Sequence, residues 1–150
     1  MEQIAPVIDF KNELSDTFDL DGKVAYLPGG YGGIGEAIAW GMAVRGASVV
    51  IGGRNGEKAK ALADDMAQAG FSASGLSVDV KSVAEIKDSV DAVVDSHGKI
   101  DILMNCVGIQ IEQPLLEVTE EAFDEVYEVN LKASMFLAQA VARRQIETGN

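Results

Sequence analysis

The sequence has little cysteine, little basic charge and no long apolar run. Cys106 is the one cysteine among 150 residues, so no disulfide can form within the chain and we expect a reducing, cytoplasmic setting. Twelve Lys and Arg stand against 24 Asp and Glu, a formal net charge of −12, which argues against nucleic acid or an anionic membrane surface as partner. The acidic first residues contain no long apolar run, which argues against a signal peptide or membrane anchor. Any bound phosphate must therefore be held by local geometry.

Histidine is equally scarce. The single histidine, His97, and the single cysteine form no cluster typical of metal ligands, so we expect no metal site. With 47% hydrophobic residues, the chain is long enough to bury the core of one domain and too short for two. We expect an N-terminal extension over residues 1–19 and one domain over residues 20–150.

From residue 23 onward, short β-rich runs alternate with amphipathic stretches of helical length. We expect strands at 24–27, 48–51, 76–80 and 100–104, and helices at 34–45, 56–69 and 82–97. Ser82 and Glu85 predict a capping box, and a final helix has an expected inward stripe from Phe123 to Val141 that contains Asn130. This alternation predicts an α/β fold: a Rossmann-type, doubly wound parallel sheet of about four strands in the order 3-2-1-4, cut short before the later strands.

A glycine-rich loop follows the first expected strand, with five glycines in residues 27–35. Such a turn lets the backbone approach a ligand closely, and the N–H groups at the start of the next helix form an anion site, for which pyrophosphate is the expected guest. The spacing Gly29-x-x-x-Gly33-x-Gly35 differs from the GxGxxG fingerprint, and glycines also serve tight strand-to-helix packing. The loop alone is compatible with both interpretations, and its place in a βαβ series favours the ligand.

Several ordered segments resemble the short-chain dehydrogenase/reductase family. Residues 29–35 match its GxxxGIG loop, and Asp79-Val80, residues 101–108 and Val129-Asn130 match later segments, so that the resemblance runs from about residue 20 to the end. The runs Asp-Leu-Asp-Gly-Lys and Gly-Gly-Arg-Asn are most similar to polyol and sugar-acid members. Pro28 departs from the family's usual threonine, whose hydroxyl helps to tie the loop to the Asn105 segment; proline has neither a hydroxyl nor an N–H.

The resemblance implies an NAD(P)-dependent oxidoreductase that transfers hydride between the nicotinamide and a small-molecule carbonyl or secondary alcohol. It implies cofactor binding by the following residues: Gly29, Tyr31, Gly33, Ile34, Gly35, Arg54, Asp79, Val80, Asn105 and Gly108. Of these, Asp79, Asn105 and Gly108 are expected on the adenosine side. It also implies a catalytic role for Asn130, which would help to hold a water and the lysine of the family's proton relay.

The end of the second strand bears on the choice of cofactor. Gly53 stands where a carboxylate would select NAD, and Arg54 offers a planar donor to the 2′-phosphate of NADP. We therefore predict NADP, with NAD as the alternative, although the glycine loop supplies no second basic residue. Arg54 can also be interpreted as a solvated side chain beside Asn55, which would cap the next helix.

The rest of the family's catalytic set is missing from these residues. No tyrosine is followed four residues later by lysine, so the Tyr-x-x-x-Lys pair is absent, and the resemblance implies that the catalytic Ser, Tyr and Lys lie beyond Asn150 in a longer enzyme. The family further implies a homodimer or homotetramer when intact. A different class of function stays open: a noncatalytic nucleotide-binding or interaction module.

Overall fold

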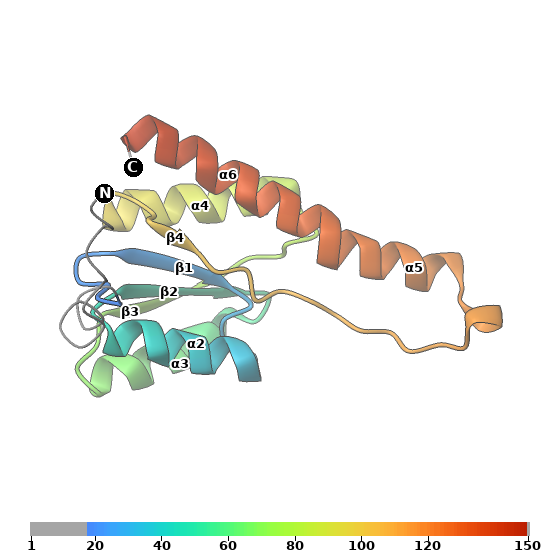
Figure 1. Cartoon of the computed structure of the whole chain (residues 1–150), viewed down its shortest axis with the longest axis horizontal. Helices are drawn as coiled ribbons and strands as arrows, with labels where there is room; N and C mark the ends of the chain where they lie inside the picture. Colours follow the sequence, from blue (N-terminus) through green and yellow to red (C-terminus); the bar gives the residue numbers. More distant parts are fainter. Residues whose placement is uncertain (1–17, 150) are drawn as a thin grey trace, which may run out of the picture.

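Four parallel strands pair in the order β3-β2-β1-β4 in the computed structural model, which describes residues 18–149. Helices cover both faces of the sheet, with α2 and α3 on one side and α4 and α6 on the other (Figure 1). The elements in chain order are β1 (Val24–Pro28), α2 (Gly33–Val44), β2 (Ser48–Gly53), α3 (Gly56–Gln68), β3 (Ala73–Ser77), α4 (Val83–His97), β4 (Ile102–Leu103), the 3-10 turn η1 (Leu115–Glu117), α5 (Glu120–Tyr127), the π-helix η2 (Glu128–Lys132) and α6 (Ala133–Thr148). The predicted Rossmann-type α/β fold and strand order are confirmed. The expected extension, residues 1–19, falls outside the described residues except for 18 and 19.

Successive side chains of β1 point to opposite faces of the sheet and belong to two separate layers of the core. Val24 and Tyr26 pack in the layer beneath α4 and α6, whereas Ala25 and Leu27 pack in the layer beneath α2 and α3. Because helices cover both faces, every residue of β1 is buried and the strand is apolar throughout.

Two strands differ from the sequence prediction. β3 covers Ala73–Ser77 rather than 76–80, because its pairing partners on β2 begin with Val49 opposite Ala73. Val78 and Val80 follow the strand and are buried in the layer beneath α4, so their alternation reflects packing of a connecting segment. β4 pairs with β1 at only two positions rather than over 100–104. At its start the Asp101 carboxylate accepts the Val24 N–H at 2.8 Å, so that a side chain provides this hydrogen bond.

Side-chain caps fix the starts of three helices. Asn55, Ser82 and Thr119 accept N–H groups from the first turns of α3, α4 and α5. The predicted capping box is only half formed, since the Glu85 carboxylate accepts the Asp79 N–H at 2.9 Å while the Ser82 N–H bonds to the Asp79 carbonyl. Glu85 thus fixes the segment that leads from β3 into α4.

The final helix is interrupted rather than continuous. The π-helix η2 separates α5 from α6, and the residues that face inward are Val129, Ala133, Leu137 and Val141. The predicted stripe is wrong in its first half, because Phe123 is 60% exposed and Asn130 is exposed as well. α5 buries none of its residues, and within the π turn Val129 is buried rather than Asn130.

One buried phenol makes the fold sensitive to alkali. Tyr26 is fully buried and its hydroxyl donates to Ser89 Oγ at 2.9 Å; burial raises the pKa of Tyr26 to about 12, although that hydrogen bond opposes the shift. Below the ordinary pKa of 10.0 the phenol is neutral in both the folded and the unfolded chain, so its contribution is fully present. Above it only the unfolded chain ionises, and the free energy of unfolding falls by about 3 kcal/mol as the pH rises to 12.

Tyr26→Phe tests this prediction. The variant should lose about 1 kcal/mol at neutral pH, because one buried hydrogen bond is removed, and should lose less stability than the wild type as the pH rises above 10. Denaturant unfolding of the intact protein, measured at a series of pH values, gives both quantities. Tyr127→Phe is the control, since Tyr127 is half exposed. The same pH dependence in wild type and Tyr26→Phe would contradict the prediction.

Candidate functional site

The parallel sheet brings several chain segments to one edge. The carboxyl ends of all four strands lie there, so the glycine loop after β1, the residues after β2 and β3, and the segment 105–109 after β4 become neighbours. This edge is where open α/β sheets bind ligands. The candidate site is therefore built from loops held by four adjacent strands.

The glycines of the loop serve different purposes. Gly29 has a φ of +79°, and a Cβ there would lie 2.7 Å from the carbonyl carbon and oxygen of Cys106. A Cβ on Gly35 would lie 2.7 Å from the Gly29 carbonyl oxygen, so both positions need glycine for packing. A Cβ on Gly33 would meet nothing within 4 Å. Gly33 thus faces open space at the start of α2.

The start of α2 offers free backbone donors. Its N-cap, Gly32, provides no side-chain cap, and the bond from the Glu36 N–H to the Gly32 carbonyl at 2.7 Å is the first of the helical type. The N–H groups of residues 33–35 precede it and have no partner within the helix. Together with the positive end of the helix dipole, they form a site suited to an anion such as a phosphate.

Two hollows flank the glycine loop and share its wall. The Arg54 hollow, about 220 Å³, lies between the glycine loop, Arg54, the segment 78–81 and α5. The Ile34 hollow, about 580 Å³, lies between the start of α2 and the segment 104–108. Gly29, Gly32 and residues 106–108 line both hollows. The two spaces therefore lie on either side of the glycine loop, as the two halves of an extended ligand would require.

The structure divides the predicted binding residues between these hollows. Tyr31, Arg54, Asp79 and Val80 line the Arg54 hollow; Gly33, Ile34, Gly35 and Asn105 line the Ile34 hollow; Gly29 and Gly108 line both. Asn105, expected beside Asp79 on the adenosine side, thus lies in the other hollow. The next residues, 106–108, line both hollows, so the segment after β4 passes from one hollow to the other.

Tyr31 occupies the space next to Gly53. A Cβ on Gly53 would lie 2.3 Å from Tyr31 Cε1, and the Tyr31 hydroxyl accepts the Asn55 N–H at 3.1 Å. A side chain at position 53 would therefore require the Tyr31 ring to move. Arg54, by contrast, is exposed and lines the hollow. Asn55 caps α3, as predicted from the sequence.

A hydrogen-bond network joins the end of β4 to the π-helix. Asn105 Nδ2 donates to Ser134 Oγ at 2.7 Å, and that hydroxyl donates to the Asn130 carbonyl at 2.7 Å. The Asn130 amide bonds twice to the backbone of Ile109: it accepts the Ile109 N–H at 2.8 Å and donates to the Ile109 carbonyl at 2.9 Å. Asn130 thereby fixes the segment that walls both hollows.

Two charged residues of the Arg54 hollow were not predicted from the sequence. Lys81 Nζ and Glu125 Oε1 lie 2.9 Å apart, and both residues line the hollow. The hydrogen bond from Lys81, and then its charge, lowers the pKa of Glu125, and the charge of Arg54 acts in the same direction. The sequence signals were the place of Lys81 directly after Asp79-Val80 and that of Glu125 one helical turn before Val129.

Cys106 and Pro28 contribute packing and backbone contacts. Burial raises the pKa of the Cys106 thiol, which disfavours the thiolate needed for a nucleophile. The Cys106 N–H donates to the Pro28 carbonyl at 2.9 Å, so the backbone ties the glycine loop to segment 105–109 although position 28 lacks a hydroxyl.

Within residues 18–149 no three His, Cys, Asp or Glu side chains gather in the manner of a metal site. No helix in the same part of the chain combines the length and apolarity needed to span a membrane.

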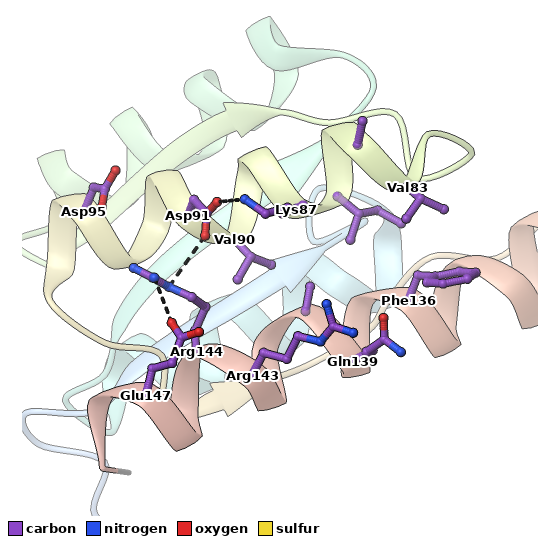
Figure 2. A pocket seen from close by; sticks show the side chains of 13 residues that line it. Val83, Lys87, Val90, Asp91, Asp95, Phe136, Gln139, Arg143, Arg144 and Glu147 are labelled. Atoms are coloured by element: carbon purple, nitrogen blue, oxygen red, sulfur yellow. Dashed lines mark hydrogen bonds and ion pairs between the residues drawn. The ribbon is translucent and has the colours of Figure 1, made fainter.

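A larger hollow, about 710 Å³, lies between α4 and α6 (Figure 2). Its charged residues pair largely with one another: Arg144 lies 3.5 Å from Asp91 and 3.0 Å from Glu147, and Lys87 also contacts Asp91. Its floor is apolar, with Ile86, Val90, Phe136 and Ala140 among its residues. It includes no part of the glycine loop, so the candidate ligand site stays at the carboxyl edge of the sheet.

Comparison with known proteins agrees with this geometry. A family model described as short chain dehydrogenase matches residues 23–150. Gluconate 5-dehydrogenase of Gluconobacter oxydans is 40% identical over 139 residues, which are 89% of this chain and 52% of that protein. D-threitol dehydrogenase of Mycolicibacterium smegmatis is 37% identical over 139 residues, 91% of this chain and 54% of that protein. The chain thus spans about half the length of these curated relatives.

A solved structure matches in the same region. The crystal structure of a gluconate 5-dehydrogenase from Burkholderia cenocepacia in complex with NADP and tartrate superposes with a TM-score of 0.86 at 39% identity. The match covers 91% of this chain and 54% of that one. The expected similarity to polyol and sugar-acid enzymes is confirmed by these relatives.

Proposed function

Because the chain belongs to the short chain dehydrogenase family, we propose that the intact protein is an NADP-dependent oxidoreductase acting on a carbonyl or secondary alcohol. When bound, the nicotinamide cofactor supplies hydride transfer. The observation that supports this most is the glycine loop, with Gly33 open to the surroundings and uncapped N–H donors beside it. A side chain at this position would fill the space that a pyrophosphate needs.

Under this proposal the residues of the two hollows bind different parts of the cofactor. Gly29, Gly33, Ile34 and Gly35 hold the pyrophosphate, with the backbone N–H groups at the start of α2 as donors. Asp79, Val80 and Gly108 contact the adenosine in the Arg54 hollow. Asn105 lies in the Ile34 hollow and supports the binding wall through Ser134. Asn130 acts in the proton relay while its amide holds Ile109.

NADP is the preferred cofactor in this proposal. Arg54 gives the 2′-phosphate a charge-assisted donor, and Gly53 offers no carboxylate that would select NAD. The solved gluconate 5-dehydrogenase described above carries NADP, which agrees with this choice. NAD remains the alternative to be compared by titration.

The proposed substrate class is polyols and sugar acids, following the names of the relatives. The intact protein should reduce NADP when given gluconate, sorbitol or threitol, and the absorbance of the reduced nicotinamide measures the rate. An intact protein that binds NADP but turns over none of these alcohols, nor the corresponding ketones with NADPH, would favour the noncatalytic nucleotide-binding module instead.

The same proposal includes a cytoplasmic location and a homodimer or homotetramer. The free thiol of Cys106 is consistent with a reducing compartment. Helix α6 presents Met135 and Ile146 at its surface, 60% and 79% exposed, and η2 adds Leu131, which suits burial against further protein. Light scattering of the intact protein should give a mass of two or four protomers; a monomer at high concentration would reject the assembly.

A further inference from the structure

Two cations line the Arg54 hollow, although the glycine loop supplies none. Arg54 follows β2 and Lys81 lies in the segment after β3, and these strands are neighbours in the sheet. Their carboxyl ends therefore deliver both side chains to one space, and both residues line it. The charge of Arg54 opposes the upward shift that Glu125 produces in the pKa of Lys81, as expected for two cations close together. Such a pair is suited to a ligand with more than one negative charge.

Glu125 lies on the opposite wall of the same hollow. It belongs to α5, and its carboxylate lies 2.9 Å from Lys81 Nζ. Lys81 and Glu125 are 32% and 46% exposed at their side chains, so their ion pair can open without leaving a buried charge. With Asp79 also on the wall, two cations face two carboxylates. The balance of charge in the hollow thus depends on Glu125.

We propose that Lys81 is a second cation for the 2′-phosphate of NADP and that Glu125 is a specificity-determining residue which neutralises Lys81 until the phosphate binds. The proposal rests on the proposed function, because it takes the Arg54 hollow as the adenosine site. On binding, the phosphate would replace the Glu125 carboxylate as the partner of Lys81. Removal of Lys81 removes attraction for the phosphate, whereas removal of the Glu125 charge leaves Lys81 unopposed.

The two substitutions are therefore expected to act in opposite directions. In the intact protein, Lys81→Gln should lower the preference for NADP over NAD, as a ratio of dissociation constants, by about fivefold. Glu125→Gln should raise that ratio by about fivefold. Glu121→Gln, an exposed acidic residue of the same helix outside the hollow, is the matched control and should leave the ratio unchanged. Calorimetric titration with each dinucleotide measures the ratio.

A second probe isolates the 2′-phosphate from the rest of the cofactor. Adenosine 2′,5′-bisphosphate and AMP share the adenosine and differ at that group, so their affinity ratio should shift with the same opposite signs. An ion pair that merely holds α5 in place predicts something else: both variants would weaken all four ligands alike and lower the melting temperature together. That result would overturn the proposal.

The proposed function fails in a different way. If the wild type binds neither dinucleotide, or prefers NAD, then the assignment of an NADP site is wrong. If the wild type prefers NADP but Lys81→Gln and Glu125→Gln keep its ratio, then only the roles of Lys81 and Glu125 are wrong. Opposite shifts in the two variants, with Glu121→Gln at the wild-type value, support the proposal.

Discussion

Gly29→Ala is expected to abolish NADP binding and to destabilise the protein, whereas Gly33→Ala is expected to weaken binding with no loss of stability. At Gly29 an added Cβ meets the Cys106 carbonyl at 2.7 Å, and the φ of +79° disfavours any side chain. Strain and overlap together cost about 3 kcal/mol. The wall shared by the two hollows would shift, and both halves of the proposed cofactor site would be lost.

Gly33 separates binding from folding. Its Cβ would meet no protein atom within 4 Å, and alanine favours the helix over glycine by up to about 1 kcal/mol. A methyl group there would enter the space proposed for the pyrophosphate. It should lower the affinity for NADP at least about tenfold, because charge-assisted hydrogen bonds are lost. Calorimetry and denaturant unfolding of the intact protein measure the two effects. Unchanged NADP affinity in Gly33→Ala would show that the loop is a packing device.

Gly75→Ala should cause the largest loss of stability away from the site. A Cβ on Gly75 would lie 2.5 Å from the Ala59 carbonyl carbon and from the Lys60 nitrogen. Both are backbone atoms of α3, so the helix would have to move away from β3, and the expected cost is about 3 kcal/mol or more. Since the free energy of unfolding of a native protein is about 5–15 kcal/mol, such a loss is a large part of the stability.

Gly41→Ala is the matched control for that substitution. Gly41 lies within α2, and a Cβ there meets nothing within 4 Å, so the same replacement should stabilise the protein by up to about 1 kcal/mol. Midpoints of denaturant unfolding should therefore move in opposite directions for the two variants. A Gly75→Ala protein as stable as the wild type would mean that α3 does not pack against β3 as closely as described.

Local patterns predicted most of the fold because they report local physics. The apolar run of β1, the cap residue Asn55 and the glycine after His97 each determine structure within a few residues, and the helices they bound agree with the prediction. The error in the bounds of β3 arose from tertiary structure, namely pairing with β2 and packing under α4. The valines at 78 and 80 alternate as in a strand, but they are buried under α4 beyond the end of β3.

The candidate site was predictable where backbone geometry carries it. The spacing of Gly29 and Gly35 after an apolar strand indicates a tight turn, and in the structure a Cβ at either position would lie 2.7 Å from backbone atoms. The pairing of Lys81 with Glu125 across the hollow was not predictable, because the two residues are 44 residues apart in sequence and meet only through the packing of α5. The π turn η2 was equally hidden, and within it Val129 is buried whereas Asn130 lies at the surface beside Ile109.

The central claim is that the Arg54 hollow and the glycine loop form an NADP site. Its most direct test is calorimetric titration of the intact protein with NADP and NAD, for the wild type and for Arg54→Gln. One charge-assisted contact is worth about 1.5–3 kcal/mol, so NADP should bind roughly tenfold to a hundredfold more tightly than NAD, and Arg54→Gln should remove most of that difference. Equal affinities in the wild type, or an unchanged ratio in Arg54→Gln, would contradict the account.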